Sequence, residues 1–157
     1  MGCSTLIINI NIFNGKDEDT SKGSILIKDN VIATISKGDI PTNEDENITI
    51  IDGKGKYLMP GLIDAHWHAY MSCNTIIDIL AAEESYTHHV AGKEAEKTLL
   101  RGFTTIRDAG GPVFGLKKAI DNNVLNGPRI YPSGAMISAQ FKTSVFLISI
   151  IGHSDTR

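Results

Sequence analysis

Two histidines separated by a single residue, His66 and His68, have the type and spacing that best fit a chemical role. They end a short apolar run that follows Pro60-Gly61, and this pattern predicts a strand over residues 62–68. Side chains at i and i+2 of a strand share a face, so both imidazoles are expected on one side and Trp67 on the other. Two imidazoles on one face can bind one divalent metal ion, whereas the alternative is a pair of partly buried histidines at a strand end.

The sequence around this pair, PGLIDAHWH, resembles the first barrel strand of the amidohydrolase superfamily, the metal-dependent hydrolases built on a TIM barrel. The resemblance implies that His66 and His68 bind the first of one or two divalent metal ions, with Zn as the expected ion. It also implies hydrolysis of a C–N bond, in an amide, a cyclic amide or a dipeptide, by metal-activated water.

Two later segments resemble one branch of that superfamily, the imidazolonepropionase-like enzymes and the metal-dependent Xaa-Pro and Xaa-Arg dipeptidases. GFTTIRDAGG (102–111) is similar to the second strand of the branch and its loop, and GPRIYPSGAMIS (127–138) is similar to the third strand. The resemblance places Arg107 and Asp108 where a TIM barrel carries its chemistry. Asp108 is therefore a candidate catalytic residue, although we favour the alternative that the two residues form an ion pair or a loop cap.

The tail of the chain contains another candidate, His153. In the same branch a Gly-His-x-Asp loop follows the third strand within a few residues, and residues 152–155 match it as Gly-His-Ser-Asp. The apolar segment Phe141–Ile151 comes before this match and has no place in the family pattern. We interpret it as translated non-coding sequence, such as a retained intron, with a genuine extra strand as the alternative; exposed, it would favour aggregation.

The first 60 residues are expected to form a small antiparallel, sandwich-like β domain. Isoleucine alternates with asparagine over residues 8–12, which is typical of a half-buried strand. Two pairs of apolar segments flank turn signals and predict hairpins: 24–28 with 31–35 around Asp29-Asn30, and 48–51 with 56–58 around Asp52-Gly53. We interpret this domain, residues 1–60, as a scaffold.

Residues 61–157 are expected to form the N-terminal part of the barrel, because strand-like and helix-like segments alternate as in βαβ units. The strands are expected over residues 62–68, 103–107 and 129–131 with 135–137. Helices are expected over 75–84, from a cap at Ser85 to Gly102, and from Pro112 to Asn126-Gly127 with Val113, Leu116, Ile120 and Val124 on one face. The fold class is thus α/β, with about three strands of a TIM (β/α)8 barrel.

Three other residues could bind metal but are expected to have structural roles. His88 and His89 are adjacent within a helix, where neighbouring side chains point about 100° apart, so they are expected to be solvated or packed. Cys73 is expected to be a small buried apolar residue.

The composition of the chain limits the classes of partner that are expected. The 157 residues are 41% hydrophobic and 21% charged, with a net charge of −3 and no basic stripe, so no nucleic acid partner is expected. The chain shows neither a signal peptide nor an apolar run of roughly 18 residues, so no membrane association and a cytoplasmic location are expected. The two cysteines are expected to be free thiols.

The length is short for the family. A TIM barrel takes about 250 residues, so the resemblance implies an N-terminal fragment that lacks the later ligands and is inactive alone. Two alternatives stay open: a non-catalytic remnant, or one half of a split enzyme completed by a C-terminal chain. The expected partner is a small amide or dipeptide substrate, and self-association into a homo-oligomer is also left open.

Overall fold

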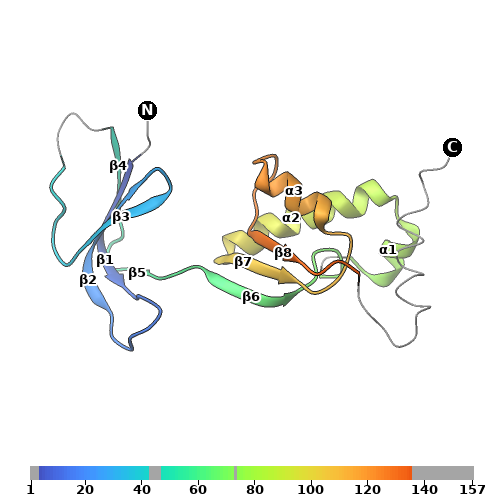
Figure 1. Ribbon diagram of the computed structural model, residues 1–157, viewed down its shortest axis with the longest axis horizontal. Coiled ribbons are helices and arrows are strands. Elements are labelled where there is room, and N and C mark those ends of the chain that lie inside the picture. Colours follow the sequence, from blue (N-terminus) through green and yellow to red (C-terminus); the bar gives the residue numbers. More distant parts are fainter. Residues whose placement is uncertain (1–3, 43–46, 73, 136–157) are drawn as a thin grey trace. The chain divides into compact units, whose positions relative to one another are not determined.

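The computed structural model describes residues 4–42, 47–72 and 74–135. The chain divides into two compact units, residues 1–60 and 61–157 (Figure 1). Within the described ranges, no helix combines the length and the apolar character needed to cross a membrane.

The first unit is a five-stranded sheet made of β1 (Ser4–Ile12), β2 (Ser21–Lys28), β3 (Val31–Ser36), β4 (Ile48–Asp52) and β5 (Tyr57–Leu58). The order is β3-β2-β1-β4, and β5 also pairs with β1. Strands β1, β2 and β3 are antiparallel neighbours, so the first predicted hairpin is confirmed. Its two turn residues, Asp29 and Asn30, have φ of 48° and 65°, which suits the tight turn between twisted strands.

The second predicted hairpin is wrong. Both β4 and β5 run parallel to β1, so the chain does not reverse at Asp52-Gly53. Instead residues 53–55 bulge past β1, where the N–H of Gly53 donates to the oxygen of Ile8 at 2.8 Å and that of Gly55 donates to Asn9 at 2.7 Å. A Cβ on Gly53 would lie 2.3 Å from a methyl group of Ile10, so this close passage requires glycine. The turn signal therefore marks a local kink within a parallel pairing.

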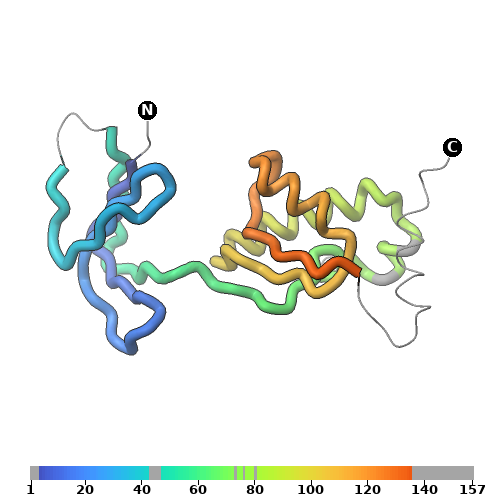
Figure 2. The backbone as a smooth tube through the Cα atoms, in the orientation of Figure 1, coloured from blue at the N-terminus to red at the C-terminus, as the bar shows by residue number. Residues whose placement is uncertain are grey.

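The second unit contains a parallel sheet with the order β6-β7-β8. Its strands are β6 (Leu62–Trp67), β7 (Phe103–Asp108) and β8 (Arg129–Pro132), which run side by side in Figure 2. They alternate with α1 (Ile76–Ala81), α2 (Glu84–Leu100) and α3 (Phe114–Asp121). The predicted alternation of parallel strands and helices is confirmed. The predicted strand over 135–137 falls mostly outside the described residues.

The helix boundaries follow the predictions only in part. Thr75 caps α1 through a reciprocal capping box with Asp78. Gly102 follows α2 with φ of 96° and donates its N–H to Leu99 at 2.9 Å, as predicted for the residue after a helix. The predicted cap at Ser85 is wrong, because α2 begins at Glu84 with Glu83 at the N-cap position.

The third helix is shorter than predicted at both ends. It begins at Phe114 with Val113 as its N-cap, so Pro112 is not its first residue. It ends at Asp121, and Val124 beyond it is 72% exposed. The cause is a left-handed residue, Asn123, whose φ of 57° stops the helix before the predicted Asn126-Gly127.

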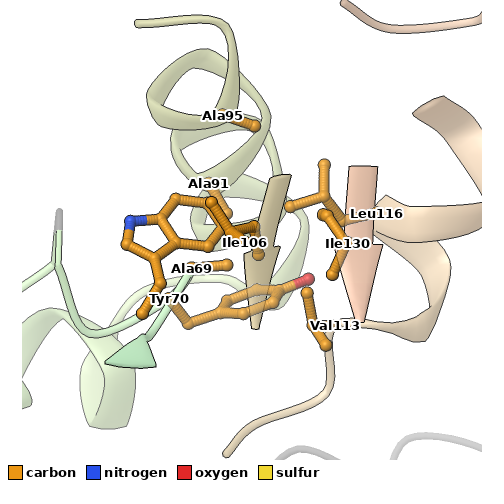
Figure 3. Packing of buried hydrophobic residues seen from close by; sticks show 9 residues of the cluster. Ala69, Tyr70, Ala91, Ala95, Ile106, Val113, Leu116 and Ile130 are labelled. Atoms are coloured by element: carbon orange, nitrogen blue, oxygen red, sulfur yellow. The ribbon is translucent and has the colours of Figure 1, made fainter. Parts of the chain in front are cut away.

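The core of the second unit lies between the sheet and its helices. Helices α2 and α3 contact β7 and β8 respectively (Figure 1). Small residues of α2 let the helix approach the strands closely, and the strand and helix side chains interlock as Figure 3 shows. The buried cluster consists of Trp67, Ala69, Tyr70, Ala91, Ala95, Ile106, Val113, Leu116 and Ile130.

Candidate metal site

The two histidines of the first barrel-like strand meet at its carboxyl end. His66 lies in β6 and His68 directly follows it, and their Nε2 atoms are 3.3 Å apart. The ring centroids are 5.1 Å apart, with an interplanar angle of 71°. Trp67 between them is only 7% exposed and belongs to the core cluster. The two imidazoles therefore converge on one side of the strand while the indole packs on the other, as the alternation predicts.

A hydrogen bond fixes the orientation of one imidazole. The Nδ1 atom of His68 lies 3.2 Å from the carbonyl oxygen of Gly110. A carbonyl oxygen only accepts, so Nδ1 carries the proton and the Nε2 of a neutral ring keeps its lone pair. Metal-binding histidines are oriented in the same way, with the other ring nitrogen donating to a carbonyl or carboxylate. His68 is thus held in the form that a metal ligand needs.

Asp108 is a buried loop cap beside this pair. Its carboxylate accepts the N–H of Ala69 at 2.8 Å through Oδ2 and the N–H of Gly110 at 3.0 Å through Oδ1, and the residue is 0% exposed. These two bonds join the residue after His68 to the loop that follows β7. Arg107 makes no ion pair with it in the described contacts; its Nε donates to the oxygen of Ala65 at 2.8 Å. The structure thus shows the loop-cap arrangement for Asp108.

The donor pair fits a divalent metal ion in part. With Zn–N bonds of about 2.05 Å and tetrahedral angles, two ligand nitrogens lie roughly 3.3 Å apart, which matches the spacing of the two Nε2 atoms. A complete tetrahedral site takes about four ligands. Within residues 4–42, 47–72 and 74–135, no group of three or more His, Cys, Asp and Glu is placed to hold a metal ion. The described residues therefore offer two candidate ligands.

Of the remaining predicted residues, two lie in α2 and the others lie outside the described ranges. The Nδ1 of His88 lies 2.7 Å from the carbonyl oxygen of Glu84, and its ring contacts Tyr70 edge-on at 5.0 Å. His89 is exposed on the same helix. His153, Cys73 and the segment Phe141–Ile151 lie outside the described residues, so their roles stay predictions.

Two features of the site were not predicted. The N–H of His66 donates to the Oδ1 of Asp64 at 3.0 Å, and the carbonyl of Gly110 accepts from His68. The first has a sequence signal, because an aspartate often accepts from the backbone two residues ahead. The second depends on which loop lies beside β6, and no local pattern reveals it.

A profile of the amidohydrolase family matches residues 57–152, which is more than half of the chain. The chain belongs to the amidohydrolase family. This match confirms the predicted family. Members of the family are generally metal-dependent hydrolases of C–N bonds. The predicted fold class is also confirmed, since similar solved structures are amidohydrolases that combine a TIM barrel with an N-terminal β-sandwich domain.

Three known proteins illustrate how this amidohydrolase chain relates to others. The 5'-deoxyadenosine deaminase of Methanocaldococcus jannaschii is 33% identical over an alignment of 143 residues that covers 80% of this chain and 32% of the deaminase. The ochratoxinase of Aspergillus niger is 29% identical over an alignment of 128 residues that covers 79% of this chain and 26% of that enzyme. A solved Xaa-Pro dipeptidase with bound methionine in its active site superposes with a TM-score of 0.70 at 32% identity, over 83% of this chain and 33% of the dipeptidase. The chain thus spans about a third or less of these relatives.

Proposed function

We propose that this protein hydrolyses a C–N bond of a small molecule and that His66 and His68 supply two ligands of the divalent metal ion involved. The observation that carries the proposal is the 3.3 Å separation of their Nε2 atoms at the carboxyl end of β6. In TIM-barrel enzymes the chemistry is located at this end of the strands. Imidazole nitrogen suits Zn, which is the ion that we propose.

The residues of the chain hold and orient this pair. When bound, a divalent metal lowers the pKa of water and polarises the carbonyl group that is attacked. The carbonyl of Gly110 keeps the Nδ1 proton of His68 in place, so that Nε2 stays available as a ligand. Asp108 accepts the N–H groups of Ala69, which follows His68, and of Gly110. It thereby holds together the two loops that the contact of His68 with Gly110 joins. We further propose that the other ligands and the proton carrier come from outside the described residues, either in the same polypeptide or in a partner chain.

The substrate class that we favour is an amide or a dipeptide. A Xaa-Pro dipeptidase is among the solved structures that cover 83% of the chain, at 32% identity. The second candidate is deamination of an adenosine-type compound, because a 5'-deoxyadenosine deaminase matches 80% of the chain at 33% identity. Both reactions break a C–N bond, and only the second releases ammonia.

Metal binding by the full chain tests whether His66 and His68 are metal ligands. Zn²⁺ affinity is measured by equilibrium dialysis with metal analysis, and Co²⁺ binding by its visible absorption spectrum. We expect His66→Ala and His68→Ala each to weaken Zn²⁺ binding at least about tenfold, because each removes one ligand. His89→Ala is the matched control, since it removes an exposed histidine of α2 and should bind as the wild type does. Equal affinity in all three variants would contradict the proposal.

The reaction class is tested separately with the Zn²⁺-loaded chain. Xaa-Pro dipeptides and adenosine are offered as substrates, with amino acid release and ammonia release as the two readouts. Amino acid release that His66→Ala abolishes supports dipeptide hydrolysis, and ammonia release supports the second candidate. Activity in the 157-residue chain would show that no partner chain is needed to supply the other ligands.

A further inference from the structure

The strand that carries the histidine pair contains a bulge at His66. In the pairing of β6 with β7, Asp64 lies opposite Ile106 and Trp67 opposite Asp108. Two residues of β6, Ala65 and His66, therefore stand opposite a single residue of β7, Arg107. A bulge bends its strand and redirects the side chains next to it, and bulges are enriched beside functional sites.

Side chains hold the backbone groups of this bulge. The Oδ1 of Asp64 accepts the N–H of His66 at 3.0 Å. The Nε of Arg107 donates to the carbonyl oxygen of Ala65 at 2.8 Å. The two atoms lie at the two ends of the peptide bond between Ala65 and His66, so the orientation of this peptide is fixed from both sides.

We propose that Asp64 and Arg107 are positioning residues that hold this peptide so that the imidazole of His66 points at that of His68. The proposal rests on the proposed metal-binding function of the pair. The rotation of the peptide sets the direction of the Cα–Cβ bond of His66, and a small rotation there moves Nε2 over a larger distance. Losing either side-chain bond therefore widens the range of Nε2···Nε2 distances around the 3.3 Å of the native arrangement.

Exposure separates this role from a general contribution to folding. Ala65, His66 and Arg107 are all exposed. The peptide can therefore bond to water when a side chain is removed, and no buried polar group is left unsatisfied. Removing Asp64 or Arg107 should change metal affinity strongly and resistance to unfolding weakly, which is the opposite of what a purely structural residue does.

Substitutions at Asp64 test the first of the two bonds in the full chain. We expect Asp64→Ala to weaken Zn²⁺ binding about 10- to 100-fold, the usual effect of losing a group that orients a metal ligand. Asp64→Asn keeps an oxygen acceptor at the same position and should restore most of the affinity. Asp78→Ala is the matched control, because Asp78 also accepts a backbone N–H, that of Thr75 at 3.0 Å, but lies in α1. It should bind Zn²⁺ as the wild type does.

Arg107 is tested with a control from the neighbouring strand. Arg107→Ala should weaken Zn²⁺ binding by a similar factor, whereas Arg129→Ala, which removes an exposed arginine of β8, should not.

The metal-free chain gives a second readout of the Asp64 bond by NMR. Asp64→Ala should shift the amide proton of His66 upfield as its bond to the carboxylate is lost, and Asp64→Asn should return it toward the wild-type position.

The outcomes separate this inference from the function on which it rests. If His66→Ala weakens Zn²⁺ binding while Asp64→Ala and Arg107→Ala do not, the positioning role is wrong. The proposed role of His66 as a metal ligand is then still supported. If Asp64→Asn binds as poorly as Asp64→Ala, Asp64 acts through its charge, and the positioning role is again wrong. If the wild type shows no binding that depends on His66, both proposals fall.

Discussion

The Nδ1 atom of His68 and the carbonyl oxygen of Gly110 lie 3.2 Å apart, so an imidazole at the end of β6 is oriented by the loop that follows β7. The N–H of Gly110 is in turn held by Asp108. The orientation of His68 therefore depends on the buried carboxylate of Asp108, which holds this loop.

The first prediction concerns Asp108. Asp108→Ala leaves the buried N–H groups of Ala69 and Gly110 without their acceptor, and we expect it to lower the free energy of unfolding by about 2–4 kcal/mol. Urea unfolding followed by Trp67 fluorescence measures this, because Trp67 is the single tryptophan and lies in the same core. An unchanged unfolding midpoint would show that water or another group takes over the two N–H groups.

The second prediction concerns Gly61, which precedes β6. A Cβ at this position would lie 2.0 Å from the hydroxyl oxygen of Thr104 and 2.6 Å from its Cβ. Gly61→Ala must displace Thr104 or the start of β6, so we expect a loss of about 1–3 kcal/mol in the same assay. Gly115→Ala is the control, since Gly115 lies in helix α3 and a Cβ there would meet no atom within 4 Å. It should raise stability by up to about 1 kcal/mol.

A third prediction uses two isoleucines of adjacent strands. Ile106 in β7 is 0% exposed and belongs to the core cluster, whereas Ile63 in β6 is 70% exposed. Ile106→Ala should cost about 2–5 kcal/mol, because it removes buried methyl groups and leaves a cavity. Ile63→Ala should cost well under about 1 kcal/mol, because surface substitutions have small effects. Similar losses in the two variants would mean that another part of the protein covers Ile63.

The fourth prediction concerns the capping box of α1. Hydrogen bonds from the hydroxyl and the N–H of Thr75 lower the pKa of Asp78 below its ordinary value. A carboxyl group whose pKa is lowered by folding stabilises the folded state above its unfolded pKa, and this contribution is lost as the pH falls through the folded pKa. An NMR titration of the Thr75 amide proton should therefore show a midpoint below about pH 3.9. Asp78→Asn should remove this transition, and a midpoint at the ordinary value would contradict the capping box.

Local patterns predicted the elements whose signals are local. The i, i+2 spacing of His66 and His68 placed both rings on one side of β6, and Gly102 marked the end of α2. The hairpin at Asp29-Asn30 followed from its turn residues. These features depend on the conformation of a few consecutive residues, so the sequence contains the information that they need.

Features that depend on neighbours in space were missed. Asp52-Gly53 is a turn signal, but the N–H groups of Gly53 and Gly55 donate to β1, so the chain kinks past that strand instead of reversing. The early end of α3 was also missed, although its cause is local, because Asn123 just beyond the helix has a left-handed φ of 57°. In the site, the contact of His68 with Gly110 joins residues 42 positions apart, and no pattern in either local segment predicts it.

The alternation along β6 has a consequence for how this stretch tolerates mutation. His66, Trp67 and His68 belong to the candidate site, the core and the candidate site again within three consecutive positions. A shift of one residue in the strand exchanges its two faces. A single inserted or deleted residue between Gly61 and His68 would therefore turn the imidazoles into the core and the indole into solvent. Changes in length within this segment should be far more harmful than changes of residue type at its exposed positions.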